Sequence, residues 1–139
     1  MSGEPITLTD RDYRRLSEMA HAMRPYSDGD TARCLDLLEG ELARAVVLGA
    51  DEAPEGIVTM DSRIQFCDVD TGETLVYTVT WPEMANPDEQ KVSVLAPIGM
   101  ALLGTSVGQV IEWPVPAGKR RFRVMKVLRQ RKLSGAASA

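Results

Sequence analysis

The first fifty residues carry two stripes of apolar side chains at helical spacing. The first stripe is Tyr13, Leu16, Ala20 and Met23, and the second is Leu35, Leu38, Leu42 and Ala45. Steps of three, four and three residues place each stripe on one side of a helix. Two helices with narrow, matching stripes and a short connection are expected to pack against each other in opposite directions. The pattern therefore predicts an antiparallel helical hairpin.

Polar and helix-breaking residues set the expected ends of these helices. Thr9, followed three residues later by Asp12, predicts the start of the first helix. Proline and glycine in residues 24–30 (RPYSDGD) end it, Asp30 is expected to cap the second helix, and Gly49 is expected to end that one. About 15 and 19 residues at about 1.5 Å each give arms of roughly 22 and 28 Å.

Alternation of apolar and polar side chains predicts strands in the second half of the chain. Residues 57–60 and 63–69 are expected strands, with Ile64 and Phe66 on one side of the second. Residues 74–81 form the clearest strand, because apolar side chains occupy one face while threonines occupy the other. The half-buried pattern is typical of an antiparallel sheet.

Turn-forming residues separate the strands. The expected turns and loops are residues 70–73, 82–89 and 114–118. The middle one (PEMANPDE) holds two prolines and three acids, so it cannot be a ladder strand and is expected to be exposed. Residues 121–128 are the expected last strand, with Phe122, Val124 and Lys126 on one side.

A short helix is expected between two of these strands. Residues 93–95 end one strand, and Pro97 has a backbone conformation suited to the first position of a helix. Gly104 offers the left-handed residue that commonly ends a helix. The sequence predicts a helix over residues 97–103 and a return to strand over residues 107–113.

Together these elements predict an α+β protein. An N-terminal antiparallel two-helix hairpin over residues 1–50 precedes a sheet domain over residues 51–133, which is mainly antiparallel and carries one short helix. The polar segment DEAPEG marks the expected boundary. Residues 134–139 (SGAASA) have nothing to bury and are expected to be a disordered tail.

Composition favours a globular cytoplasmic protein. Apolar residues make up 44% of the 139 residues but aromatic residues only 5%, so the core must be mainly aliphatic. The sequence shows neither a membrane-length apolar run nor a secretion signal, and cytoplasmic localisation is the expectation. Cys34, Cys67 and His21 are too few for a disulfide framework or a zinc site, so no metal and no cofactor is expected.

Charge is distributed very unevenly along the chain. Residues 1–118 carry eight bases and all 20 acids, a net charge of −12, whereas residues 119–139 carry eight bases and no acid. An acidic body with a basic end argues against general coating of nucleic acid. It favours a surface that meets a charged partner in one orientation.

The central stretch resembles a known family. Residues 96–104 (APIGMALLG), 107–110 (VGQV) and 116–118 (PAG) resemble the C-terminal domain of the Gre transcript-cleavage factors. Residues 58–66 (VTMDSRIQF) and the short N-terminal part resemble the small Gre-like regulators of nucleoside diphosphate kinase. The resemblance implies an FKBP-like sheet domain. It does not imply prolyl isomerase activity, because few aromatics are present to line such a pocket.

The same resemblance implies a partner. In Gre factors the loop entering the short helix lies against the rim helices of the RNA polymerase β′ subunit. The matching positions here are Leu95, Ala96, Pro97 and Ile98. Ala96 stands where Gre factors have a serine cap worth about 1 kcal/mol. The alternative, that this loop merely closes the core, stays open at this point.

The hairpin tip holds Tyr26, Asp28 and Asp30. In Gre factors a longer hairpin enters the secondary channel of the polymerase and presents acids that help to hold magnesium. Here the hairpin looks too short, and the favoured interpretation is one turn aspartate and one helix cap. Tyr26 is either a contact anchor for a partner or an aromatic folded back on the hairpin.

The sequence shows no phosphate-binding glycine loop, metal-binding helix or nucleophile elbow, so an enzyme is not expected. The resemblance implies a non-catalytic regulator that docks on RNA polymerase, competes with longer Gre factors and affects nucleoside diphosphate kinase indirectly. One alternative is nucleic-acid contact through residues 119–132, including Lys119, Arg120, Arg121 and Arg123. Another is a Gre-like factor that stimulates transcript cleavage.

Overall fold

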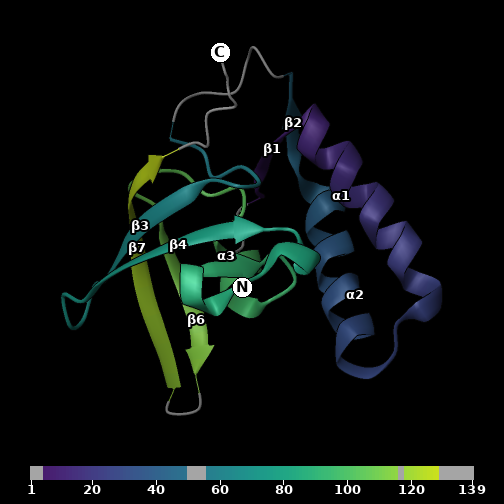
Figure 1. Cartoon of the computed structure of the whole chain (residues 1–139). Helices are drawn as coiled ribbons and strands as arrows, with labels where there is room; N and C mark the ends of the chain where they lie inside the picture. The colour runs from purple at the N-terminus through teal and green to yellow at the C-terminus, as the bar shows by residue number, and fades with distance from the viewer. Residues whose placement is uncertain (1–4, 50–55, 116–117, 129–139) are drawn as a thin grey trace.

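The structure is a computed structural model that describes residues 5–49, 56–115 and 118–128. A two-helix hairpin stands beside a sheet domain, and the short helix α3 lies on the sheet (Figure 1). This confirms the predicted α+β class. The boundary expected at residues 51–56 and the tail at 134–139 lie mostly or wholly outside the described residues.

The hairpin consists of α1 (Asp10–Met23), the 3-10 turn η1 (Arg24–Tyr26) and α2 (Gly29–Arg44). The predicted start of α1 is confirmed, because the Thr9 hydroxyl oxygen accepts the Asp12 N–H at 3.1 Å. The apolar stripes face each other and the sheet. The buried stripe residues are Leu16, Ala20, Leu35, Leu38 and Leu42.

Two details predicted for α2 are wrong. Asp28, not Asp30, occupies the cap position, with an extended backbone and no capping hydrogen bond to its side chain. The helix ends at Arg44 rather than at Gly49, because Ala45 adopts an extended conformation (ψ 145°). The residues that follow form strand β2 (Val46–Leu48) instead of another helical turn.

A small parallel sheet at the base of the hairpin was not expected from the sequence. Strand β1 (Thr7–Thr9) enters the hairpin and pairs in parallel with β2, which leaves it. The Thr7 N–H donates to the carbonyl oxygen of Gly104 at 3.1 Å and so ties this base to the other domain. Gly104 has the predicted left-handed conformation (φ +76°), and a Cβ there would lie 2.5 Å from Cβ of Ile6.

The main sheet has five strands in the order β5-β4-β3-β7-β6. They are β3 (Arg63–Asp68), β4 (Thr74–Thr80), β5 (Lys91–Ser93), β6 (Val110–Val115) and β7 (Gly118–Leu128). Neighbours are antiparallel except for β4 and β5, which run parallel. The sheet is therefore mixed. The parallel pair is possible because the segment with the 3-10 turns η2 (Pro82–Met84) and η3 (Pro87–Glu89) carries the chain back before β5 begins.

Several strand boundaries differ from the prediction. Ile57 makes only an isolated bridge to Ser106, and the positive φ of Asp61 (65°) interrupts the chain, so the first ladder strand begins at Arg63. Strand β6 begins at Val110 rather than at residue 107. It continues through Pro114, which pairs with Lys119, so the turn into β7 is shorter than expected.

A bulge in β7 overturns the predicted position of Lys126. Gln65 pairs with Lys126, but the next residue, Phe66, pairs with Val124, so one residue of β7 has no counterpart in β3. The alternation of β7 therefore shifts beyond Val124. Lys126 is exposed, while Val127 packs against the core.

The core lies between the sheet and α3 (Pro97–Leu102), and it continues under the hairpin. Most of its members are aliphatic, as the composition predicted. Phe66 packs edge to face against Phe122, with ring centroids 5.1 Å apart. No helix in the described part of the chain is long and apolar enough to cross a bilayer.

Candidate partner-binding surfaces

The loop between β5 and α3 is ordered by Ser93. The Ser93 hydroxyl oxygen accepts the Leu95 N–H at 3.0 Å, and its carbonyl oxygen accepts the Ala96 N–H at 3.0 Å. Ala96 has the extended backbone of a cap residue (φ −71°, ψ 150°) but offers no side-chain hydrogen bond. The helix therefore depends on Pro97 at its first position and on burial of its apolar side.

The four residues of this loop differ in accessibility. Pro97 is exposed, while Leu95 and Ala96 are half-buried. Ile98 is only 5% exposed and belongs to the core, so its side chain closes the domain. The accessible part of the loop is thus centred on Pro97.

Gly99 is a structural requirement of this loop that the sequence reasoning missed. A Cβ on Gly99 would lie 2.1 Å from the carbonyl oxygen of Ser93. The helix consequently approaches the end of β5 as closely as backbone atoms allow. The sequence did offer a signal for this close contact. Glycine is unfavourable inside a helix, so its presence in the middle of a six-residue apolar helix indicates that a side chain would not fit there.

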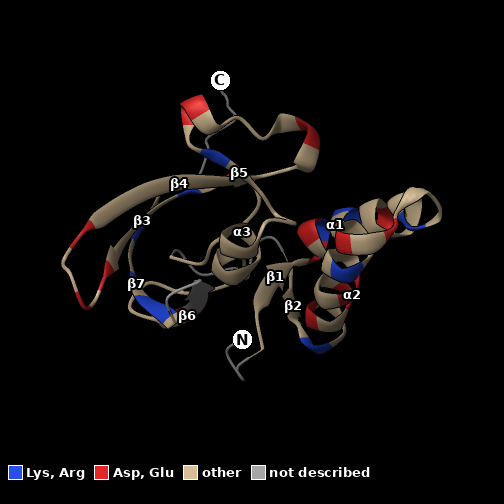
Figure 2. Ribbon diagram, turned by 90° about the horizontal axis from the view of Figure 1, so that it is seen from below, with Lys and Arg blue, Asp and Glu red and all other residues tan. Residues whose placement is uncertain are grey.

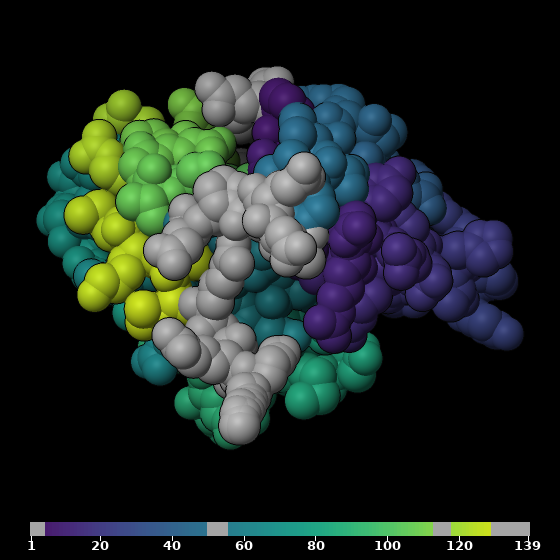
Figure 3. Space-filling view, turned by 90° about the horizontal axis from the view of Figure 1, so that it is seen from above, coloured from purple at the N-terminus to yellow at the C-terminus, as the bar shows by residue number. Residues whose placement is uncertain are grey.

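The hairpin tip exposes Tyr26, whose side chain is 89% accessible and does not fold back on the helices. The main-chain carbonyl oxygen of Asp28 accepts the Thr31 N–H at 3.1 Å, while its side chain is exposed and makes no capping hydrogen bond. Asp30 forms an ion pair with Arg33 one turn along α2. Figure 3 shows the hairpin as a lobe that projects from the body of the molecule, with the tip at its outer end.

Arg24 fastens the two helices just below the tip. Its guanidinium group contacts the Asp36 carboxylate at 2.9 Å and the Glu39 carboxylate at 2.6 Å, both on α2. These contacts, that of Glu39 above all, raise the pKa of Arg24 above its ordinary value. The acids on this side of α2 are therefore engaged within the hairpin.

The hairpin is joined to the sheet domain through α1. The buried carboxylate of Asp12 accepts the Met60 N–H at 2.9 Å, and its burial raises the pKa of Asp12. One turn further, the Arg15 guanidinium lies over the Trp81 ring, 4.5 Å from its centroid. Asp12 thus has a long-range role that its position in a helix start did not reveal.

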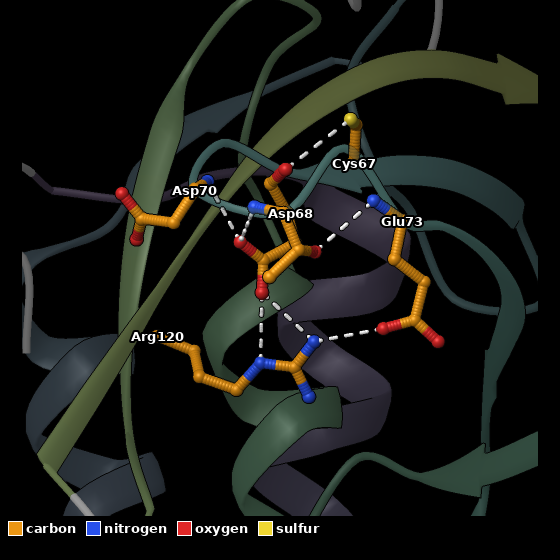
Figure 4. Close-up of polar contacts among 6 residues, drawn as sticks. Cys67, Asp68, Asp70, Glu73 and Arg120 are labelled. Atoms are coloured by element: carbon orange, nitrogen blue, oxygen red, sulfur yellow. Dashed lines mark hydrogen bonds and ion pairs between the residues drawn. The ribbon is translucent and has the colours of Figure 1, made fainter.

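Three bases of the basic segment are paired with neighbouring acids. Lys119 lies 3.6 Å from Glu112, and Arg121 lies 2.8 Å from Asp70. Arg120 contacts Asp68 at 2.8 Å and also reaches Glu73 (Figure 4). Of the four bases predicted as a contact segment, Arg123 alone makes no ion pair within the described residues.

Asp68 organises the turn between β3 and β4. Its carboxylate accepts the N–H groups of Asp70 at 2.8 Å and Thr71 at 3.1 Å, and it also accepts from Arg120 (Figure 4). The hydrogen bond from Asp70, supported by Arg120, holds the pKa of Asp68 below its ordinary value. These contacts make the turn a structural feature and explain why the Arg120 side chain is not free for a partner.

The candidate residues do not form a single site. The tip residues lie at the outer end of the hairpin, whereas the loop residues lie where α3 meets the sheet (Figure 1). The described residues include no group of three or more His, Cys, Asp or Glu side chains arranged to hold a metal ion. The candidate residues supply an exposed proline, an exposed tyrosine and charged surface groups.

Two family profiles match the chain. The family described as "Transcription elongation factor, GreA/GreB, C-term" matches residues 52–129, and "Rnk N-terminus" matches residues 4–48. The boundary between the two matches falls where the hairpin gives way to the sheet domain. Each structural unit is therefore similar to a different segment of known proteins.

Relatives extend over most of the chain. The regulator of nucleoside diphosphate kinase of Escherichia coli K12 is 36% identical over 122 residues, which cover 85% of this chain and 84% of that protein. Transcription elongation factor GreA of Alkaliphilus oremlandii is 35% identical, covering 68% of this chain and 60% of that protein. A solved GreA/GreB structure from Nitrosomonas europaea is 35% identical, with a TM-score of 0.73 and coverage of 90% and 98%.

Proposed function

Because the chain belongs to the GreA/GreB transcription elongation factor family, we propose that it is a non-catalytic regulator that binds RNA polymerase. The loop around Pro97 docks at the rim of the secondary channel, and the hairpin occupies the mouth of the channel. Longer members of the family are then excluded by competition. Any effect on nucleoside diphosphate kinase is indirect and follows from altered transcription.

The length of the hairpin carries this proposal. The helices α1 and α2 have 14 and 16 residues. At about 1.5 Å per residue they extend roughly 21 and 24 Å, less than the sequence alone suggested. We infer that such an arm stays at the channel mouth, because the Gre factors that reach the catalytic metal carry a longer hairpin.

The chemistry of the tip also argues against a role in cleavage. Asp30 is paired with Arg33, which leaves Asp28 as the one tip carboxylate without a side-chain partner among the described residues. One carboxylate does not hold Mg²⁺ by itself, because a carboxylate-bound Mg²⁺ also needs further oxygen ligands such as substrate phosphates and waters. Tyr26 instead supplies a large apolar surface that suits contact with the channel wall.

The loop around Pro97 is suited to docking because it is rigid and partly exposed. Its backbone is held by Ser93 and by the close approach of Gly99, so little conformational entropy is lost on binding. Pro97 presents a fixed apolar surface beside half-buried Leu95. Ile98 contributes by anchoring this surface to the core rather than by touching the partner.

A competition assay tests the proposal. Purified core polymerase is incubated with labelled GreB, and the protein is titrated in; we expect GreB to be displaced. Pro97→Asp should raise the concentration needed for displacement at least tenfold, because it places a charge in an apolar contact. The matched control is Pro87→Asp, which makes the same change at another exposed proline that also begins a short helix.

The cleavage assay separates this proposal from its alternative. With backtracked elongation complexes, the protein alone should not shorten the RNA, and it should inhibit shortening by GreB. Stimulated cleavage would contradict the non-catalytic role. No displacement of GreB at any concentration would contradict docking at the channel.

A further inference from the structure

The side of the main sheet that faces away from α3 carries an unpaired group of basic residues. We define the outer face by those outward side chains of the three central strands that are paired in the ladders of β3 with β4 and β7. They are Arg63, Gln65 and Cys67 on β3, Thr74, Val76 and Thr78 on β4, and Arg123, Lys126 and Leu128 on β7. The ladder register pairs these residues across the strands, so they lie in three adjacent rows.

The opposite side of the same strands forms the core. Ile64, Phe66 and Phe122 alternate with outer-face residues and are fully buried. The sheet curves around α3, and no described helix covers its other side (Figure 2). The outer face is therefore open within the described part of the structure.

Three cations on the outer face are not neutralised. Arg63, Arg123 and Lys126 make no ion pair with any described residue, in contrast to Lys119 and Arg121 on the same sheet. None of the nine outer-face residues is acidic. Two carboxylates beside this face are themselves paired: Glu112 on β6 contacts Lys119, and Asp70 contacts Arg121.

The three cations are close enough to act together. Arg63 pairs with Leu128, and Lys126 lies two residues before Leu128 on the same strand, a diagonal separation of about 7–8 Å. Arg123 lies three residues before Lys126 across the bulge, roughly 10 Å away at about 3.3 Å per residue. Gln65, Thr74 and Thr78 add hydrogen-bond donors among them.

We propose that the outer face binds the phosphate backbone of duplex DNA without reading its sequence. Arg, Lys, Gln and Thr are side chains that contact phosphate oxygens. The face has no aromatic residue on which the bases of a single strand would stack. It also lacks the buried aromatic anchors typical of protein interfaces. Electrostatic attraction to a regular row of phosphates accounts for the basic and polar side chains of the face and does not require an aromatic residue.

Binding of this kind has a measurable salt dependence. Each neutralised phosphate contributes about −0.9 to the slope of log K against log salt concentration, so three cations contribute about −2.7. The affinity is expected to be weak at physiological salt for so few contacts. This inference is independent of docking on polymerase, because it is tested on the isolated protein.

Fluorescence anisotropy of a labelled mixed-sequence duplex, measured with the full chain between about 50 and 200 mM salt, tests it. The combined variant Arg63→Gln, Arg123→Gln and Lys126→Gln should reduce the magnitude of the slope by about 2.7. The control Arg33→Gln, Lys119→Gln and Arg121→Gln changes the net charge equally but removes bases that are already paired. It should leave the slope unchanged.

Several outcomes would overturn the proposal. An equal loss in the control would assign binding to net charge rather than to the outer face. Tighter binding to single-stranded RNA than to duplex would contradict the stated ligand. Binding to poly-L-glutamate that depends on the three cations, without duplex binding, would assign the face to an acidic protein. Matching unfolding midpoints of both variants exclude misfolding as the cause.

Discussion

The carboxylate of Asp12 accepts the main-chain N–H of Met60 at 2.9 Å and so joins the first turn of α1 to the segment before β3. Asp12 is 7% exposed, and its partner lies 48 residues away in the sequence. A single hydrogen bond thus helps to fix the hairpin relative to the sheet domain.

Replacing Asp12 by alanine should destabilise the protein by about 1–3 kcal/mol, because the buried Met60 N–H loses its acceptor. Urea unfolding at neutral pH measures the change. The matched control is Asp10→Ala in the same helical turn, where the side chain is exposed and an effect within about 0.5 kcal/mol is expected. Equal effects of the two variants would contradict a specific role for the Met60 contact.

Stability should depend on pH through Asp12 in a defined direction. Burial raises its pKa above the ordinary value of 3.8, so the folded protein holds this proton more tightly than the unfolded chain. The corresponding stabilisation is present when the pH is below the pKa of Asp12 in the unfolded chain. It is lost as the pH rises through the pKa of Asp12 in the folded protein. Relative to Asp12→Asn, the wild-type protein should therefore become less stable from about pH 4 toward neutrality, as measured by urea unfolding.

Asp68 should make stability depend on pH in the opposite direction to Asp12. The N–H of Asp70 and the Arg120 guanidinium hold the pKa of Asp68 below 3.8, so its contribution is present above the unfolded pKa and is lost as the pH falls through the folded one. The variant Asp68→Asn should lose less stability than the wild type on acidification from about pH 6 to about pH 3. Identical acid profiles would show that Asp68 titrates alike in both states.

Two glycine substitutions should have opposite effects. Gly99→Ala places a methyl group 2.1 Å from the Ser93 carbonyl oxygen and should cost roughly 2 kcal/mol or more, because α3 must move. Gly40→Ala in α2 meets nothing within 4 Å and should stabilise the protein by about 0.5–1 kcal/mol. Chemical unfolding measures both, and destabilisation by Gly40→Ala would contradict the packing described for α2.

The exposed tyrosine at the tip allows function to be separated from stability. Tyr26→Ala should change the free energy of unfolding by less than about 0.5 kcal/mol, since the side chain is 89% exposed. It should nevertheless weaken displacement of GreB from polymerase if the tip touches the channel mouth. Unchanged displacement would restrict the contact to the loop around Pro97.

The parts of the fold that could be predicted from the sequence depend on local signals. The helical stripes of α1 and α2, the cap at Thr9, Pro97 at the start of α3 and the left-handed Gly104 each lie within a few residues of the structure they determine. The family resemblance singled out the loop around Pro97 as a candidate contact with a partner. Whether that loop or the tip touches a partner stays a prediction.

The parts that could not be predicted depend on partners far away in the chain. The strands β1 and β2 have three residues each and form only because both ends of the hairpin meet. The bulge in β7 is visible only against the register of β3, and it moves Lys126 to the other side of the sheet. Likewise, which bases are neutralised depends on turns such as that of Asp68, so a count of charges could not locate the free ones.

The parallel pairing of β1 with β2 brings the entry and the exit of the helical arm to one place. Whole turns added to or removed from both helices at the far end would leave this joint and its contacts unchanged. The length of the hairpin can therefore change without altering the sheet domain to which it is attached. A graded series of such arms would measure how hairpin length affects displacement of GreB from polymerase and cleavage of backtracked RNA.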